Sequence, residues 1–293
     1  MASTLTYDVY VTPGIPIVTQ SKPPGVTETV FQAMAATLIY GERDAVLVDA
    51  FLTVAQANAL ADWIASKGKN LTTIYITHGH GDHWFGGATL LERFPQAKLV
   101  ATAGTVGVMR LNASPEALDG VWRPSFPGVI PEKLVIAEEL KGYTIDLEGQ
   151  QLIPVELGHT DTDKTTCLHV PSIGLVVAGD AVYNDVHLYL AESNPAKRQE
   201  WITALDKIDA LKPRAVVAAH KRPERRDLPE NVGETRRYVR DFDRLVQTAS
   251  SAQELYDEML ALYPNRVNPG WALWSSAQAQ AKKAQELSGG RSH

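Results

Sequence analysis

The most informative segment of this sequence is Thr77-His78-Gly79-His80-Gly81-Asp82-His83-Trp84-Phe85-Gly86-Gly87. It follows a β-branched run, Leu71 to Thr77, that predicts a strand, and a helical pattern begins soon after it. Imidazoles beside a carboxylate suit zinc, and also iron or manganese. We therefore expect a metal centre on this turn, built from the four ligand-type side chains that fall within six residues: His78, His80, Asp82 and His83.

Further ligands are expected elsewhere in the chain, because four groups from one turn cannot all reach one tetrahedral ion. Three residues follow predicted strands, namely those over 151–157, 174–179 and 215–219. Open α/β sheets place their binding crevices at such carboxyl ends. Seven groups can then converge once the three are added: His159, Asp180 and His220.

The remaining pattern mixes helices with strands that follow one another directly, which predicts a layered α/β fold with mixed sheets. We expect a hairpin over 35–49, a helix over 53–67 and a helix that begins at Asn194-Pro195, whereas 103–131 reads as irregular. The predicted organisation is a catalytic core over 1–222 and a helical extension over 223–290 packed on it. Residues 291–293 resemble an affinity-tag remnant.

Composition narrows the function classes. The 293 residues carry 28 Lys and Arg against 34 Asp and Glu, a net charge of −6, which argues against a nucleic-acid partner. The arginines between 222 and 244 alternate with acidic residues and read as a solvated helix face. The single cysteine, Cys167, excludes an internal disulfide. We find no apolar stretch that could span a membrane and no signal-peptide pattern, so the expected location is the cytoplasm.

Four motifs together resemble the metallo-β-lactamase superfamily: His78-x-His80-x-Asp82-His83, Gly158-His159-Thr160, Gly179-Asp180 and Ala219-His220. They match that family's successive metal motifs in order, across roughly residues 30 to 222. The resemblance implies a four-layer αββα sandwich with the metals at one edge. It also implies a first metal on His78, His80 and His159. The second would lie on Asp82, His83 and His220, and Asp180 would bridge the two ions.

The resemblance implies a hydrolase in which two metal ions share a bridging hydroxide, with Asp82, Asp180 and Tyr183 as the catalytic residues. We expect two Zn²⁺ per chain, with iron or manganese as alternatives, and a lactone, ester or thioester as substrate. The lactonase and glyoxalase II-like members are the better match, since the commonest metallo-β-lactamases use a Cys ligand and lack the bridging Asp. Three other activities stay open: a mononuclear iron dioxygenase of the same fold, a phosphodiesterase and a β-lactam hydrolase.

Several residues near the motifs are candidates for supporting roles. Tyr183 resembles a tyrosine that follows the bridging aspartate in quorum-quenching lactonases and is expected to contact the substrate carbonyl or leaving group. Aromatic side chains line small-molecule sites, and the expected substrate contacts are Trp84, Phe85, Tyr183 and His187. The expected supports of the imidazoles are Asp49, Thr160 and Asp161. The segments expected to close over the site hold Trp122, Phe126, Trp271 and Trp274. The expected partner is a small-molecule substrate, and a homodimer is left open.

Overall fold

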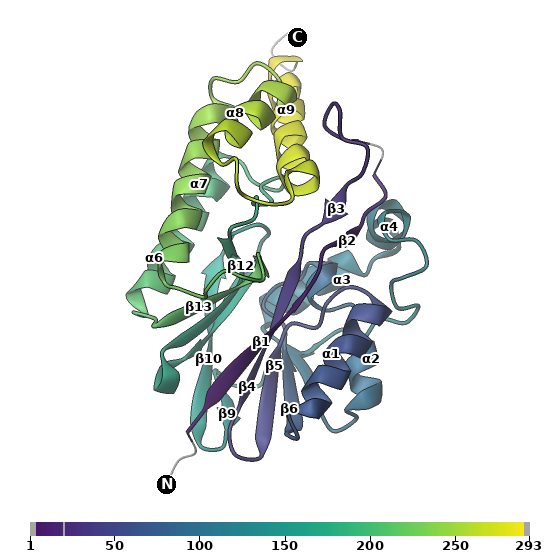
Figure 1. The fold of residues 1–293 in the computed structure, drawn as a ribbon, viewed down its shortest axis with the longest axis vertical. Coiled ribbons are helices and arrows are strands. Elements are labelled where there is room, and N and C mark those ends of the chain that lie inside the picture. Colours follow the sequence, from purple (N-terminus) through teal and green to yellow (C-terminus); the bar gives the residue numbers. More distant parts are fainter. Residues whose placement is uncertain (1–3, 20, 290–293) are drawn as a thin grey trace.

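One curled sheet organises residues 4–19 and 21–289, the part of the chain that this computed structural model describes (Figure 1). The tag-like residues 291–293 lie outside it. The first half of the sheet holds β1 (Thr6–Thr12), β4 (Met34–Tyr40), β5 (Asp44–Val48), β6 (Asn70–Tyr75), β7 (Lys98–Ala101) and β8 (Glu138–Glu139). The second holds β9 (Ile145–Leu147), β10 (Gln150–Gly158), β11 (Thr165–Val170), β12 (Leu175–Asn184) and β13 (Ala215–Lys221).

The two halves meet where β13 runs antiparallel to β4, and the register pairs His220 with Met34. β4 and β5 form the expected hairpin, with Thr37 opposite Val48. A small separate sheet of β2 (Ile15–Pro16) and β3 (Val30–Phe31) lies above this junction in Figure 1. The junction brings a candidate metal ligand from the last strand next to the first hairpin.

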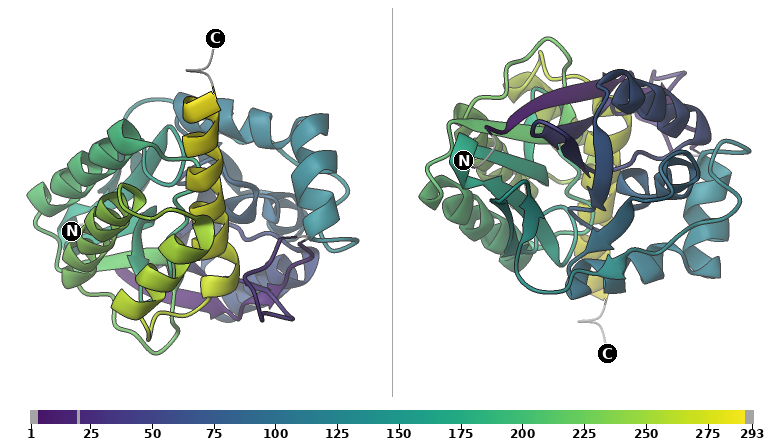
Figure 2. Two further views of the ribbon diagram at one scale, coloured as in Figure 1. Left: turned by 90° about the horizontal axis from the view of Figure 1, so that it is seen from above. Right: turned by 90° about the horizontal axis from the view of Figure 1, so that it is seen from below.

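Three hydrophobic clusters show the layers. One lies between the two halves of the sheet and joins Val48 and Tyr75 to Leu168 and Val177. A second packs the first half against α1 (Val54–Ser66), α2 (Gly87–Arg93) and α3 (Ala103–Asn112), and a third packs the second half against α6 (Pro195–Ala210) and the C-terminal helices. Helices therefore cover both outer faces (Figure 2), which confirms the predicted αββα sandwich.

Local sequence sets the ends of two of these helices. Thr53 caps α1, accepting from the backbone N–H of Gln56 at 3.2 Å, and the side chain of Gln56 returns to the Thr53 N–H as a capping box. Asn194 caps α6, and Pro195 occupies the first turn, where a missing N–H costs no hydrogen bond. Both helices begin where the sequence predicts them.

The C-terminal helices α7 (Glu230–Val246), α8 (Ala252–Leu262) and α9 (Trp274–Gly289) pack on the second half of the sheet. Thr235 on α7 accepts a 3.1 Å hydrogen bond from the backbone N–H of Tyr183. Near the start of α9, the Ser276 hydroxyl accepts from the N–H of Leu190 at 2.8 Å. This extension is thus bonded to the strand and loop that follow Asp180. No helix within the described residues is both long and apolar enough to cross a membrane.

The segment 103–131 differs from its prediction, because most of it is helical. It contains α3, α4 (Pro115–Ala117), a π-helical turn (Leu118–Trp122) and α5 (Arg123–Ser125). Thr102 and Ser114 cap α3 and α4, and Pro115 stands in the first turn of α4. Prolines at helix starts do not break helices, so their presence here misled the prediction. β12 and β13 also continue to Asn184 and Lys221, so that Asp180 and His220 lie within strands rather than after them.

Candidate metal centre

The candidate ligands gather where the two halves of the sheet meet. The loop after β6 brings His78 and His80, and its short 3₁₀ turn, Gly81–His83, brings Asp82 and His83. His159 follows β10, Asp180 lies within β12 and His220 lies near the end of β13. All of these side chains are buried except that of His80, which is partly exposed. Segments far apart in the chain thus form one polar cluster in an apolar surrounding.

Gly179 allows the strand to present Asp180. Its φ of +55° is one that residues with a Cβ rarely adopt, and a Cβ there would lie 2.6 Å from the Thr77 hydroxyl oxygen. The β12–β13 register shifts on both sides of it. β12 therefore bulges here, next to the strand end that leads into the His78 loop, and turns the Asp180 carboxylate into the cluster.

One group of ligand atoms contains Asp82, His83 and His220, all within 4.8 Å of one another. The Asp82 carboxylate lies 3.4 Å from His83 Nε2 and 3.3 Å from His220 Nε2. Asp180 lies at 3.4 and 3.3 Å from the same two nitrogens. Metal–ligand bonds of about 2.1 Å at tetrahedral angles leave neighbouring ligand atoms about 3.4 Å apart. The spacing of this group therefore fits a tetrahedral ion.

A second group joins His78 and His80 to Asp161. Asp161 Oδ2 lies 3.3 Å from His78 Nε2 and 2.7 Å from His80 Nδ1. The Asp161 side chain is fully buried, and its other oxygen accepts from the Thr160 hydroxyl at 2.8 Å. Asp161 thus faces the ligating side of both imidazoles instead of supporting them from behind. A third group, of His78, His83 and Asp180, links these two.

Hydrogen bonds with protein groups fix one ring nitrogen of His78 and one ring nitrogen of His83. Asp49 accepts from His83 Nδ1 at 2.9 Å and from the Thr77 hydroxyl at 2.9 Å. Because the Thr77 hydroxyl gives its proton to Asp49, it accepts from His78 Nδ1, 3.1 Å away. Nε2 of each ring is left facing the cluster, buried and without a hydrogen bond, as the nitrogen that can bind a cation.

The other three imidazoles follow the same pattern. Glu192 accepts from His80 Nε2 at 2.9 Å, Asp163 from His159 Nδ1 at 2.7 Å, and the carbonyl of Ala33 from His220 Nδ1 at 3.1 Å. Such partners fix the tautomer and the ring orientation of metal-binding histidines. Five imidazoles are therefore set in the form that can coordinate a cation.

His159 stands apart from the groups. None of the three groups found among the described residues includes it. It is buried, and its Nε2 has no hydrogen-bond partner in the described structure. The structure thus brings six of the seven predicted ligands into compact groups and places Asp161 beside His78 and His80, where the sequence analysis expected His159. Its role as a ligand stays a prediction.

Strong fields act inside this cluster in the absence of cations. Burial lowers the pKa of His220, but Asp180 and Asp82 outweigh burial and raise that pKa to about 10. Burial likewise opposes protonation of His80 and His83, yet nearby carboxylates raise both pKa values well above the usual range. Burial raises the pKa of Asp82, and the facing imidazoles return it to well below its ordinary value. The carboxylates of this site therefore favour bound positive charge, which either protons or metal ions can supply.

Tyr183 is held against Asp180. Its hydroxyl donates a 2.7 Å hydrogen bond to Asp180 Oδ2, and its ring stacks on His220 at 5.7 Å between centroids. Burial and the charge of Asp180 raise the pKa of Tyr183 well above its usual value, so the hydroxyl keeps its proton. Tyr183 is consequently a fixed hydrogen-bond donor at the centre.

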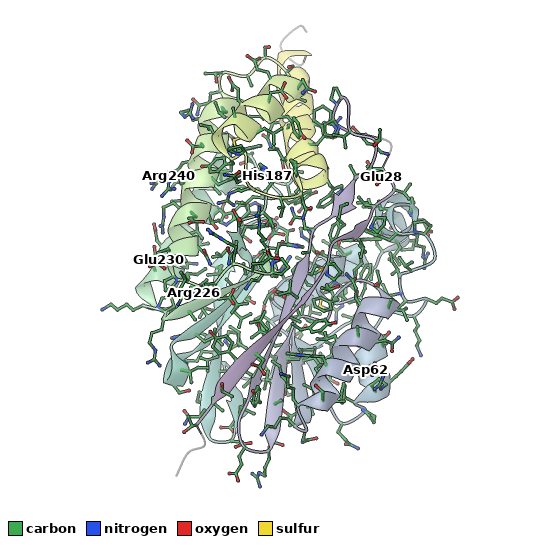
Figure 3. All side chains as sticks on the ribbon, viewed as in Figure 1. Glu28, Asp62, His187, Arg226, Glu230 and Arg240 are labelled. Atoms are coloured by element: carbon green, nitrogen blue, oxygen red, sulfur yellow. The ribbon has the colours of Figure 1, made fainter. Side chains whose placement is uncertain are left out.

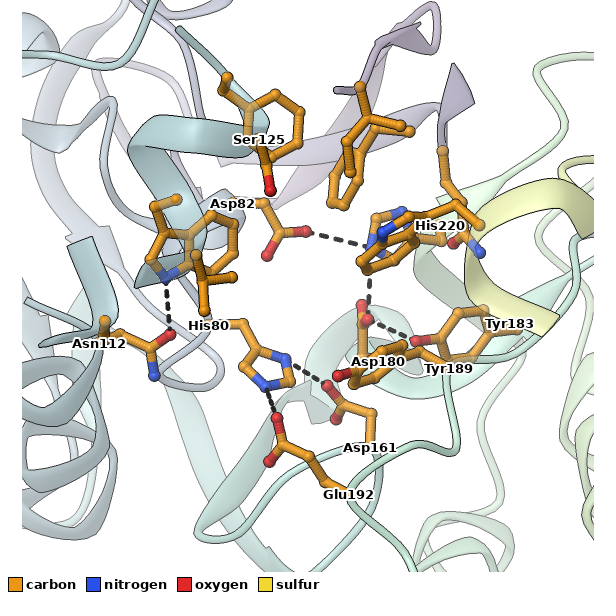
Figure 4. Close-up of a pocket in the computed structure, with 18 residues that line it drawn as sticks. His80, Asp82, Asn112, Ser125, Asp161, Asp180, Tyr183, Tyr189, Glu192 and His220 are labelled. Atoms are coloured by element: carbon orange, nitrogen blue, oxygen red, sulfur yellow. Dashed lines mark hydrogen bonds and ion pairs between the residues drawn. The ribbon is translucent and has the colours of Figure 1, made fainter. Parts of the chain in front are cut away.

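A cavity of about 240 Å³ opens over the cluster (Figure 4). His80, Asp82, Asp180 and His220 form part of its lining, together with Tyr183. Three of the four aromatic residues expected to close over the site also line it: Trp122, Phe126 and Trp271. The fourth, Trp274, instead packs on Tyr256 and donates to the Ser21 hydroxyl.

Two expected substrate contacts are core residues. Trp84 and Phe85 are completely buried, and neither is among the described residues that line the cavity. The Trp84 indole donates to the carbonyl of Gly79 at 3.0 Å, and a Cβ on Gly81 would lie 2.5 Å from the Phe85 ring. The prediction that Trp84 and Phe85 contact the substrate is therefore wrong. Both rings pack in the hydrophobic layer between the sheet and the helices and support the loop that carries the ligands.

His187 is corrected in the same way. It is fully buried between the core and the C-terminal helices (Figure 3), and its Nδ1 lies 2.9 Å from the Tyr238 hydroxyl. Burial and Arg266 lower its pKa to about 3, so it is neutral. It does not line the cavity as described.

Glu192 is a site residue that the sequence did not reveal. It lines the cavity, and it accepts from the Thr162 hydroxyl at 2.7 Å as well as from His80. It lies in a loop before α6 with no motif around it, so only the fold shows its role. In the sequence, a further ligand could have been inferred only from the carboxylate of Asp161, which lies two residues after His159.

Comparison with known proteins identifies the family of the chain. Residues 34–220 match the family model described as "Metallo-beta-lactamase superfamily". A hydroxyacylglutathione hydrolase of Francisella tularensis subsp. holarctica (strain OSU18) is 36% identical over 67 residues. That match spans 23% of this chain and 25% of the relative, so the chain matches only about a quarter of the relative's length.

Solved structures share the fold at low identity. A metallo-beta-lactamase family protein from Thermus thermophilus is 20% identical, with a TM-score of 0.63 over 96% of this chain and 94% of its own. A beta-lactamase domain protein from Burkholderia ambifaria is 18% identical, with a TM-score of 0.59 over 93% and 88%. A metallo-beta-lactamase from Pontibacter korlensis is 17% identical, with a TM-score of 0.55 over 80% and 100%. With the family model matching well over half of it, this chain belongs to the metallo-β-lactamase superfamily, whose members are generally hydrolytic metalloenzymes.

Proposed function

We propose that this protein is a dinuclear metal hydrolase that cleaves small ester-like substrates, namely lactones, esters or thioesters. The observation that carries the proposal is the arrangement of the five imidazoles. Each has one nitrogen bonded to a protein partner, and in four of them the other nitrogen faces a carboxylate at 2.7–3.4 Å. Imidazoles held in this way bind cations once the nitrogen that faces the cluster has lost its proton.

We propose two cation positions. Asp82, His83 and His220 would hold one ion, and His78, His80 and Asp161 the other, with Asp180 between them. We propose zinc, because the set combines imidazoles with a few carboxylates and one group has tetrahedral spacing. When bound, such ions lower the pKa of water to about 7 and polarise a carbonyl group.

The chain's own groups have separate roles in this proposal. Asp180 faces both groups of ligands and would keep the two cations at a fixed separation. Asp82 would bind a cation and orient the attacking water. Tyr183 keeps its proton and, on turning its hydroxyl away from Asp180, would offer a hydrogen bond to the substrate carbonyl or to the leaving group. The thioester option is supported by the short match to a hydroxyacylglutathione hydrolase.

A small molecule in the cytoplasm is the proposed substrate, with neither nucleic acid nor membrane as partner. The net charge of −6 supports this view. So do the arginines near α7: Arg236 pairs with Asp206 and Asp209, and Arg222 pairs with Asp185. The charges of Arg222 and Arg236 are thus paired within the protein.

The test is an assay panel on metal-replete protein, covering lactones, carboxyl esters, thioesters, β-lactams and phosphodiesters. We expect turnover of an ester-like substrate that chelators abolish and that His80→Ala or Asp180→Ala reduces to background, with far-UV circular dichroism unchanged. Near-normal kcat in either variant would refute the assigned roles. Metal analysis in the same preparations should give two zinc ions per chain, and one iron ion per chain would instead favour the dioxygenase alternative.

A further inference from the structure

The wall of the cavity is aromatic and continuous. The Trp122 and Phe126 rings lie 6.3 Å apart, and Phe126 meets Phe31 edge-on at 5.2 Å. Phe31 then contacts Trp271 at 4.8 Å, and Trp271 stacks on Tyr189 at 5.2 Å with an interplanar angle of 6°. Five rings from four separate segments thus form one arc above the ligand cluster. Such a surface binds apolar groups by removing them from water.

Outside its histidines, the charged side chains that line the cavity as described are all carboxylates. Four carboxylates contribute to its lining, and the described lining residues include no lysine or arginine. Three of them, Asp82, Asp161 and Asp180, face the imidazoles, and together with one hydroxide they would balance the charge of two divalent cations. Glu192 is different, because its carboxylate bonds to Nε2 of His80, the ring nitrogen opposite the one that faces Asp161, and its side chain is 44% exposed. It therefore keeps a negative charge at the cavity even when the metal positions are filled.

An anionic substrate would meet Glu192 without any cationic side chain to bind its charged groups, and like charges in a partly desolvated site repel. An uncharged substrate with an apolar substituent would meet no such penalty and would gain contact with the aromatic arc.

We propose that this cavity selects uncharged ester-like substrates with an apolar substituent and rejects anionic ones, including thioesters of glutathione. The inference rests on the proposed hydrolase function and narrows it. In the reaction, water adds across the acyl–sulfur or acyl–oxygen bond, that bond breaks, and a carboxylic acid and a thiol or alcohol leave. The apolar acyl group lies against the arc formed by Phe31, Trp122 and Phe126.

Three thioesters with the same hexanoyl group test the proposal on metal-replete protein. They are S-hexanoyl-N-acetylcysteamine, which is uncharged, S-hexanoylglutathione, which has a net negative charge, and the N-acetylated dimethyl ester of the latter, in which the ammonium group and both carboxylates are masked. We expect kcat/KM for S-hexanoylglutathione to be at least about tenfold below that of the other two, and the gap to narrow as salt is added. The masked ester separates charge from size.

A charge introduced at the wall provides the reverse test. Val121 lines the cavity and is 56% exposed, so Val121→Lys should fold normally. We expect this variant to raise kcat/KM for S-hexanoylglutathione about fivefold relative to the uncharged thioester. Val121→Gln, of similar length but uncharged, is the matched control and should keep the wild-type ratio.

The outcomes separate the two proposals. Equal kcat/KM for the three thioesters, a preference for S-hexanoylglutathione, or poor turnover of the dimethyl ester would overturn the selectivity while leaving the hydrolase function intact. A Val121→Lys variant with the wild-type ratio would also overturn it. If no ester, lactone or thioester is hydrolysed at all, the proposed function itself fails and the selectivity fails with it.

Discussion

Asp49 accepts a 2.9 Å hydrogen bond from Nδ1 of His83 while its backbone stands at a φ of +65°. The same carboxylate accepts from the backbone N–H and from the hydroxyl of Thr77. One buried side chain thus ties the end of the first hairpin to the loop that carries four candidate ligands. The position of His83 Nε2 depends on this bond.

Asp49→Asn should therefore weaken metal binding. Asparagine tolerates a positive φ and keeps the shape of the side chain, but it removes the charge that orients the His83 ring. We expect affinity for Zn²⁺ to fall about 10- to 100-fold, measured by competition with a chromophoric chelator. Asp62→Asn, at an exposed carboxylate of α1, is the control and should bind like wild type. Wild-type affinity in Asp49→Asn would show that Asp49 only closes the end of the strand.

Asp161 offers a sharper test of the ligand set. Asp161→Asn should lower the metal content towards one ion per chain, because an amide is a poor substitute for a carboxylate between His78 and His80. Metal content by mass spectrometry and the visible spectrum of the Co²⁺-substituted protein both report this directly. Asp163→Asn changes the same charge on the same loop, but Asp163 is half-exposed and contacts Nδ1 of His159. If only the Asp163 variant loses metal, the site contains His159 in place of Asp161.

Tyr183→Phe separates turnover from metal binding. The hydroxyl bonds to a charged carboxylate, an interaction worth about 1.5–3 kcal/mol, so kcat should fall roughly 10- to 100-fold. The metal content should stay the same, because the ring still packs on His220. The highly exposed Tyr143 provides a control as Tyr143→Phe. Unchanged kcat in Tyr183→Phe would make Tyr183 a packing residue.

Metal uptake should release protons near neutral pH. Without metal, the surrounding carboxylates raise the pKa values of His80, His83 and His220 and favour their protonated forms, whereas coordination requires neutral rings. Calorimetric titration of Zn²⁺ into metal-free protein in buffers of different ionisation enthalpy measures this release. We expect at least about two protons per chain at pH 7 and fewer as the pH approaches 10. Heats that do not depend on the buffer would contradict the charge state of the cluster.

The raised pKa of His220 also predicts how the stability of the metal-free protein changes with pH. Folding raises the pKa of His220 from about 6.5 to about 10, so its ion pairs with Asp82 and Asp180 stabilise the metal-free protein fully below about pH 6.5. That contribution declines as the pH rises through the folded value. Chelated protein should accordingly unfold more easily at pH 10 than at pH 7 by this mechanism.

The motifs predicted the fold and the neighbourhood of the site because the ligands lie on strands or on the loops that directly follow them, where backbone geometry leaves few alternatives. The sequence could not show which way a side chain points within an irregular turn. Trp84 and Phe85 were therefore predicted to contact the substrate, yet the 3₁₀ turn at Gly81–His83 directs them into the helical layer. Asp161 was expected behind the imidazoles for the same reason.

Contacts between residues far apart in the chain could not be predicted from the sequence either. Glu192 reaches His80 across 112 residues, and Trp271 meets Phe31 from the far end of the chain. Such pairs arise from how the layers stack, and no local pattern encodes them. The helices of 103–131 were missed because prolines in first turns look like breakers until the caps Thr102 and Ser114 are seen in place.

The most direct test of the two-cation site is an anomalous diffraction experiment on zinc-loaded crystals at the zinc absorption edge. We expect two peaks about 3.5–4 Å apart. One should be bounded by His78, His80 and Asp161, and the other by Asp82, His83 and His220, with Asp180 reaching both. A single peak, or peaks away from these side chains, would contradict the two-cation site.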